Sequence, residues 1–96
     1  MDNAEIFFIR TLQYDKENTV ALINLGNIGY LRKDYGYAER KYLKALKHDQ
    51  QNVGVLANLA RCTLKQNKTK EAIDYYQRVE QINPEYAKSI KEFQKN

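Results

Sequence analysis

The sequence predicts an all-α protein in which one helical hairpin is copied along the chain. Apolar residues recur at intervals of three and four, the spacing of one helix face, and the alternation typical of strands is absent. A longer regularity accompanies this pattern, because Ala38 and Tyr42 return 34 residues later as Ala72 and Tyr76. Together these observations predict about six helices, joined by short connections and packed as antiparallel neighbours.

Length and composition are those of one small, ordered domain. The chain has 96 residues, of which 43% are hydrophobic and 29% charged, a composition that excludes a disordered tail. The longest strictly apolar run, Ile6 to Ile9, is far shorter than the roughly 20 residues of a membrane span. No basic stretch precedes an apolar run near the start, so we expect no secretory signal. The single cysteine agrees with a cytoplasmic location.

The first two helices are predicted by polar caps followed by apolar periodicity. Asp2 or Asn3 can accept a hydrogen bond from the opening amides of a first helix that runs to about Tyr14. Asn18 or Thr19 can cap the second helix in the same way. Its apolar positions are Val20, Leu22, Ile23, Leu25, Ile28 and Leu31.

The third and fourth helices begin at similar signals. Asp34 is placed to cap a third helix that starts near Tyr35 and ends near Lys47, and its charge favours the positive end of the helix dipole. Asn52 caps a fourth helix, which closes around Asn67 because Asn tolerates the left-handed conformation that ends many helices.

The fifth helix begins at Lys68 and is stopped by Asn83 and Pro84. Proline cannot continue the hydrogen bonds of a preceding helix, but it suits the first turn of the next one. We therefore expect a sixth helix with four inward-facing residues: Tyr86, Ala87, Ile90 and Phe93.

Two blocks of the chain, Thr19 to Asn52 and Val53 to Tyr86, align without a gap. Five pairs of positions are identical: Leu22 and Leu56, Asn24 and Asn58, Leu25 and Leu59, Ala38 and Ala72, Tyr42 and Tyr76. The pattern resembles the tetratricopeptide repeat, a 34-residue helix-turn-helix unit with Leu-Gly, a later alanine, an aromatic residue and a proline. The resemblance implies a right-handed superhelical stack of antiparallel helix pairs, a TPR-like α-solenoid.

The same resemblance divides the chain into units. Residues 1–18 resemble a half repeat that supplies only a second helix, residues 19–52 and 53–86 resemble whole repeats, and residues 87–96 resemble a closing helix. The aromatic residue usual near the end of the first helix of a unit is replaced by Gly29 and Thr63. We expect looser packing at these two positions.

The first helix carries apolar residues where the later units carry mostly polar ones. Ile6 and Ile9 align with Arg40 and Leu43, and Phe7 lies beside them. Repeats bury their apolar faces against neighbours, so these three residues predict an uncovered patch. The patch can pair with a second copy of the chain or with upstream repeats, or it can fold onto its own neighbour.

Catalytic and metal-binding chemistry is not indicated. His48, the only histidine, follows the predicted end of a helix, where a cation interacts favourably with the dipole. Cys62 has no histidine at helical spacing and is typical of a small core residue. Leu25-Gly26-Asn27-Ile28-Gly29 lies within a helix and lacks the strand that precedes a phosphate-binding loop. We expect no enzyme and no cofactor.

The resemblance also implies a binding groove, because the first helix of each unit lines the concave surface of the family. The groove residues it assigns here are Asn27, Tyr30, Asn58, Arg61, Lys65, Lys88 and Lys91. Arg61 and Lys65 lie one helical turn apart, as do Lys91 and Lys95, so the carboxyl half of the groove should be basic. Asn58 and its equivalent Asn24 can form hydrogen bonds to the backbone of a bound peptide or to the next repeat, and the two roles are equally well supported.

These residues suggest a protein-interaction module with a scaffold or adaptor role, which binds an acidic or amphipathic peptide. The net charge of +4 favours acidic partners without requiring nucleic acid, and few aromatic side chains are placed to stack on bases. The alternative is a self-assembly unit that pairs as a homo-oligomer through Ile6, Phe7 and Ile9.

Overall fold

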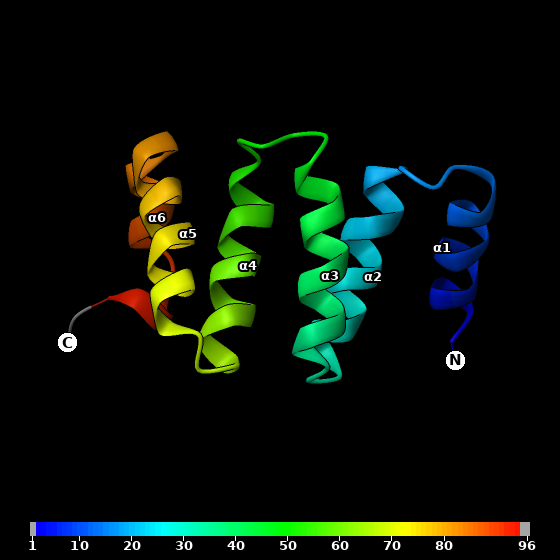
Figure 1. The fold of residues 1–96 in the computed structure, drawn as a ribbon, viewed down its shortest axis with the longest axis horizontal. Coiled ribbons are helices and arrows are strands. Elements are labelled where there is room, and N and C mark those ends of the chain that lie inside the picture. Colours follow the sequence, from blue (N-terminus) through cyan, green and yellow to red (C-terminus); the bar gives the residue numbers. More distant parts are fainter. Residues whose placement is uncertain (1, 95–96) are drawn as a thin grey trace.

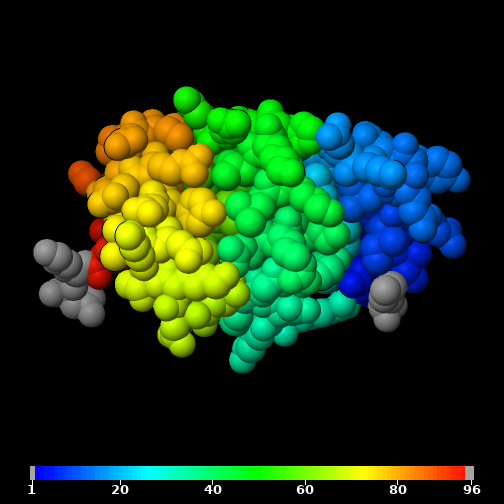
Figure 2. All heavy atoms as spheres, viewed as in Figure 1, coloured from blue at the N-terminus to red at the C-terminus, as the bar shows by residue number. Residues whose placement is uncertain are grey.

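The computed structural model describes residues 2–94, which form six α-helices and one 3₁₀ turn (Figure 1). In chain order they are α1 (Asn3–Tyr14), α2 (Thr19–Leu31), α3 (Tyr35–Leu46), α4 (Val53–Lys65), α5 (Thr69–Ile82), α6 (Pro84–Lys88) and η1 (Lys91–Phe93). The helices stand side by side in a stack of 42 × 24 × 19 Å, and its long axis runs from α1 to α6 (Figure 1). In the space-filling view of the same face, side chains of α3, α4 and α5 form a continuous surface (Figure 2).

The helix starts lie where the sequence predicts them, because polar side chains satisfy the first free amides. The Asn18 side chain accepts a hydrogen bond from the Ala21 amide, and Asn52, its equivalent in the next repeat, accepts one from Val55. The other side-chain caps are Asp2, Asp34 and Asn83. Helix α5 begins at Thr69, and the residue before it, Lys68, makes no capping hydrogen bond with its side chain.

The two whole repeats also share the geometry of the turn between their helices. Lys33 and Asn67 both adopt left-handed backbone conformations, with φ of 64° and 62°. The residue after each donates its amide hydrogen to a carbonyl five positions back, at 2.8 Å in Asp34 and 2.9 Å in Lys68. This bonding pattern closes a helix at a left-handed residue. The prediction for Asn67 is confirmed, whereas Lys33 carries no sequence signal for this conformation.

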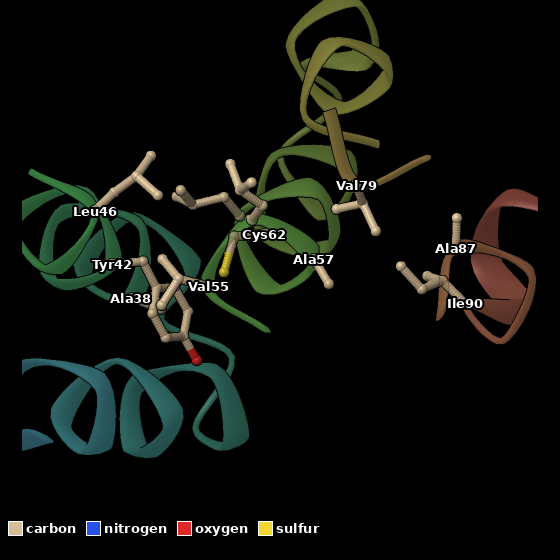
Figure 3. Packing of buried hydrophobic residues seen from close by; sticks show 11 residues of the cluster. Ala38, Tyr42, Leu46, Val55, Ala57, Cys62, Val79, Ala87 and Ile90 are labelled. Atoms are coloured by element: carbon tan, nitrogen blue, oxygen red, sulfur yellow. The ribbon is translucent and has the colours of Figure 1, made fainter. Parts of the chain in front are cut away.

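Small residues let the paired helices approach closely. Ala38 and Ala72 are both 0% exposed, and Leu25 and Leu59, their partners in the repeat pattern, are buried as well. The core continues from α3 through α4 to the closing segment, where Ala87 of α6 and Ile90, which follows α6, lie opposite Val79 of α5 (Figure 3). An interior of this density leaves no room for larger residues.

The expectation of loose packing at Gly29 and Thr63 is wrong. A Cβ added to Gly29 would lie 2.7 Å from Cδ1 of Tyr37 and 3.3 Å from the Ala38 nitrogen, so α2 and α3 are in direct contact there. Thr63 is fully buried, and its hydroxyl donates to the Leu59 and Ala60 carbonyls at 2.7 and 3.1 Å. At Gly29 the neighbouring helix α3 fills the place of the usual aromatic residue.

The end of the chain differs from the continuous closing helix that was expected. Helix α6 ends at Lys88, and η1 follows after Ile90, which has extended backbone angles. Phe93 of η1 stacks on Tyr76 with 4.7 Å between ring centroids, and the Gln94 amide donates to the Ala87 and Ile90 carbonyls. These contacts fold the end of the chain back onto α5. Lys95 and Asn96 lie outside the described residues.

At the other end, α1 is held to α2 by an ion pair. The carboxylate of Glu5 is almost fully buried and contacts Nη1 of Arg32 at 2.8 Å. Phe7 is 65% exposed, and Ile6 is exposed on the same helix. Ala4, which aligns with the buried Ala38 and Ala72, is also exposed. In α1 the face that a repeat normally covers with its own first helix is therefore open.

Candidate functional site

A line of polar contacts crosses the repeats at the predicted groove. The Tyr42 hydroxyl donates to Oδ1 of Asn27, and Nδ2 of Asn58 approaches the same oxygen at 3.5 Å. Nη1 of Arg61 donates to Oδ1 of Asn58 at 3.0 Å, and Nε of Arg61 lies 3.3 Å from the Glu92 carboxylate. We call these five residues the polar ladder. It links the first whole repeat to the end of the described chain.

Of the predicted groove residues, three are joined by side-chain contacts, and a fourth, Tyr30, packs against the core. Asn27, Asn58 and Arg61 belong to the polar ladder and are half-buried. Tyr30 packs against the core, edge-on to Tyr35 at 5.3 Å between ring centroids. Its burial raises the pKa of Tyr30, and the Glu92 carboxylate raises that pKa further. The side chain of Tyr30 therefore lies within the electrostatic reach of the ladder.

The three predicted lysines are placed differently. Lys65, Lys88 and Lys91 are exposed. Within residues 2–94, no hydrogen bond or ion pair connects their side chains to the ladder. Their charges remain available to a ligand at the rim, where water and salt weaken the attraction.

Glu92 changes the electrostatics that the sequence suggests. Arg61 is the most buried cation of the predicted groove, and its guanidinium already holds both Asn58 and Glu92. The ion pair offsets its positive charge, so the carboxyl half of the groove is less basic than the list of residues implies.

Sequence reasoning treated Tyr42 as a packing residue only, although a buried tyrosine hydroxyl usually needs a hydrogen-bond partner. The repeat interval indicates only that Asn27 lies near its equivalent Arg61, 34 residues later, and does not identify Asn27 as the partner of Tyr42. Equivalent residues of adjacent repeats lie near each other in a stack. Asn24 differs from its equivalent Asn58, because its amide donates to the Val20 carbonyl in its own helix.

The opposite end of the predicted groove is apolar. Val20 and Leu31, both on α2, are 64% and 81% exposed. Ile23 lies between them in the sequence and is half-buried against the core. Helix α2 thus offers apolar contact area, whereas α4 offers amide and guanidinium groups. An amphipathic segment would match both.

The two residues with potentially reactive side chains, Cys62 and His48, lie in different surroundings. Burial raises the pKa of the Cys62 thiol to about 12, so the thiol stays protonated and unreactive at neutral pH. Nε2 of the exposed His48 lies 3.6 Å from the Glu17 carboxylate. Within residues 2–94, no group of His, Cys, Asp and Glu side chains could hold a metal ion. In the same part of the chain, every helix is too short or too polar to cross a membrane.

Comparison with known proteins agrees with the repeat geometry. The family model described as tetratricopeptide repeat matches residues 29–92, more than half of the chain. No curated protein matches the chain. The matched segment contains the second helix of the first whole repeat, all of the second repeat and most of the closing segment. The chain therefore belongs to the tetratricopeptide repeat family.

Proposed function

We propose that the chain is a protein-interaction module that binds an acidic or amphipathic peptide along the polar ladder, in a scaffold or adaptor role. Membership of the family supports a protein partner. The observation that supports an acidic peptide as the ligand is the ion pair between Arg61 and Glu92, at 3.3 Å. In this proposal a carboxylate of the ligand takes the place of Glu92, because Arg61 already pairs with a carboxylate there.

In the proposed complex, one part of the peptide contacts an apolar surface and another part contacts charged and polar side chains. Apolar side chains of the peptide lie on Val20 and Leu31, which are already exposed to water. A carboxylate of the peptide exchanges with Glu92 on Arg61, while Asn58 keeps Arg61 in place through its 3.0 Å hydrogen bond. Lys65, Lys88 and Lys91 attract further acidic residues at the rim.

The direct test is a peptide-array screen with acidic, neutral and basic peptides that share the same apolar residues. Charge reversal at Arg61 and Lys65 together should weaken the binding of acidic peptides about tenfold or more, because charge-assisted hydrogen bonds are lost. The matched control reverses the charges of Arg10 and Lys70, which are exposed on α1 and α5. If both double variants lost the same affinity for acidic peptides, the effect would come from net charge alone, and the polar ladder would be rejected as the binding site.

A second experiment tests the role of Glu92. Glu92→Gln removes the competing charge but keeps the shape, so acidic peptides should bind several-fold more tightly. Glu85→Gln, on the exposed first turn of α6, is the matched control. If Glu92→Gln leaves the affinity unchanged or lowers it, then Glu92 does not compete with the ligand.

Self-assembly through α1 is the second candidate function, and the exposure of Phe7 favours it. Phe7 and Phe8 meet edge-on at 5.5 Å, while Ile9 is half-buried. Ile6→Asp or Ile9→Asp should reduce self-association in sedimentation and leave peptide binding intact. Charge reversal at Arg61 and Lys65 should do the opposite. A chain that stays monomeric at high concentration would eliminate this candidate.

A further inference from the structure

A basic hollow lies along the edge of the stack where the α1–α2 and α3–α4 connections both run, shown at the top of Figure 1. Its volume is about 240 Å³, and its lining comes from three separate segments. Lys16 and Glu17 belong to the first connection, Leu22 to α2, and Lys44, Lys47 and His48 to the end of α3 and the residues after it. The fold thus brings Lys16 next to Lys44 and Lys47, which lie close together but much later in the sequence.

The positive charge of this hollow is only partly offset, because Glu17 is in its lining beside the three lysines. Within residues 2–94, no carboxylate pairs with Lys16, Lys44 or Lys47, whereas Lys68 and Arg61 each have an acidic partner. Glu17 faces His48 across 3.6 Å at the rim. Burial lowers the pKa of Lys41, and the neighbouring charges of Lys44 and Arg40 lower it further, in agreement with a positive field along α3.

An apolar hollow adjoins the basic one. It has a volume of about 360 Å³ and is lined by Leu43, Leu46, Lys47, Gln50 and Arg78. Leu43 is 37% exposed there, although it is a large hydrophobic residue. Lys47 lines both hollows, so the two lie on the same part of α3 and the residues after it.

We propose that these two hollows together bind a phosphorylated peptide, with its phosphate among Lys16, Lys44 and Lys47 and a neighbouring apolar side chain on Leu43. A phosphate monoester carries about −1.5 to −2 charges at neutral pH and has three strong acceptor oxygens, which match three ammonium groups. A carboxylate carries a single negative charge and therefore attracts the three lysines less strongly than a phosphate monoester does. An apolar hollow beside the basic one matches a peptide side chain, a contact that free phosphate cannot make.

The site is separate from the polar ladder, so its test does not depend on peptide binding there. The probes are a short peptide with a phosphoserine near a leucine, the same peptide with serine, and inorganic phosphate. Binding is followed by isothermal titration calorimetry and by amide chemical shifts. The phosphopeptide should bind about tenfold or more tightly than its unphosphorylated form, with the largest shifts around Lys44 and Lys47.

Three variants sharpen the test. Lys44→Glu with Lys47→Glu should abolish phosphopeptide binding, while the control Arg10→Glu with Lys70→Glu, which has the same change in net charge, should retain it. Leu43→Ser should weaken the phosphopeptide and leave the response to inorganic phosphate unchanged. Glu17→Gln should tighten binding by removing a repulsive charge. Circular dichroism of each variant verifies that it is folded.

Several outcomes would overturn the proposal. Equal losses in the two double variants would mean general attraction of anions to a basic protein. Equal affinity for phosphorylated and unphosphorylated peptides would reject the phosphate site. Binding to vesicles that contain phosphoinositides, without binding to the phosphopeptide, would assign the surface to a membrane headgroup instead.

Discussion

The two whole repeats carry the same alanine and tyrosine at equivalent positions, yet they pack the tyrosine differently. In the first repeat, Tyr42 is 1% exposed, and its ring lies 2.6 Å from the place where a Cβ on Gly26 would be. In the second repeat, Ala60 takes the place of Gly26 and is itself fully buried. Tyr76 is only half-buried there and stacks on Phe93 of the closing segment.

This difference indicates that a single methyl group, present in Ala60 and absent from Gly26, can change where the tyrosine of a repeat packs. The interior has no spare volume, so a ring and a Cβ cannot share the space next to the first helix. Glycine therefore admits Tyr42 between the helices, where its hydroxyl reaches Asn27. In the second repeat, the Cβ of Ala60 occupies that space, and Tyr76 lies farther out, where its ring stacks on Phe93 of η1.

The largest effect is expected from removing each ring. Tyr42→Ala should lower the free energy of unfolding by about 3 to 5 kcal/mol, as for other buried aromatic residues, because a cavity remains in the core. Tyr76→Ala should cost less, since part of its ring already contacts water. Denaturant titrations followed by circular dichroism measure both changes. Equal losses would mean that the two tyrosines are packed alike.

Exchange of the two small residues tests the steric argument directly. Gly26→Ala should destabilise the protein by about 1 to 3 kcal/mol through overpacking against Tyr42, although alanine favours helices. Ala60→Gly should also destabilise, by about 1 kcal/mol, because glycine is a poor helix former and leaves a gap. If Gly26→Ala raised the midpoint of the denaturant titration, the Tyr42 ring would have to move aside easily. The steric explanation of the difference between the two tyrosines would then be wrong.

Loss of a hydroxyl group should have a smaller effect. Tyr42→Phe leaves Oδ1 of Asn27 without its donor from Tyr42 and should cost about 1 kcal/mol. Tyr76→Phe should cost less, because the Tyr76 hydroxyl donates to the Ala87 carbonyl at 3.3 Å in a partly exposed position where water can replace it. Thermal unfolding of the two variants gives the ranking, and the reverse order would contradict the assignment of Tyr42 to the ladder.

The smallest effect concerns the left-handed residues between the paired helices. Lys33→Gly should stabilise the protein by up to about 1 kcal/mol, because a lysine side chain crowds its own backbone at a φ of 64°. Asn67→Gly should change the stability less, since asparagine tolerates this conformation. Denaturation midpoints distinguish the two. A loss of stability in Lys33→Gly would show that the flexibility of glycine in the unfolded chain outweighs the relief of strain.

Much of the fold was predictable because its signals are local. Asn18, Asp34 and Asn52 cap their helices as expected, and Asn83 with Pro84 separates α5 from α6. The 34-residue interval placed Leu25, Leu59 and the two alanines in the core. The break after Lys88 was missed, because the apolar spacing of Ile90 and Phe93 also suits a continued helix.

The candidate site was predictable only in part. Repeat positions indicated Asn27, Tyr30, Asn58 and Arg61, and side-chain contacts join Asn27, Asn58 and Arg61 in the structure. The partners of Arg61 and of Tyr42 could not be assigned, because a chain of side-chain contacts depends on how neighbouring repeats are turned against each other. The roles of Lys65, Lys88 and Lys91 in binding stay predictions.

The sequence by itself determined the helices, their caps and the repeat unit, since each of these depends on residues within one or two helical turns or on a fixed interval. Only the tertiary structure decided which charges are neutralised and which remain free. Arg61 is paired with Glu92, while Lys16, Lys44 and Lys47 surround a hollow without a carboxylate partner among residues 2–94. Electrostatic energy falls with distance in space and not along the chain, so charge counts alone could not locate these groups.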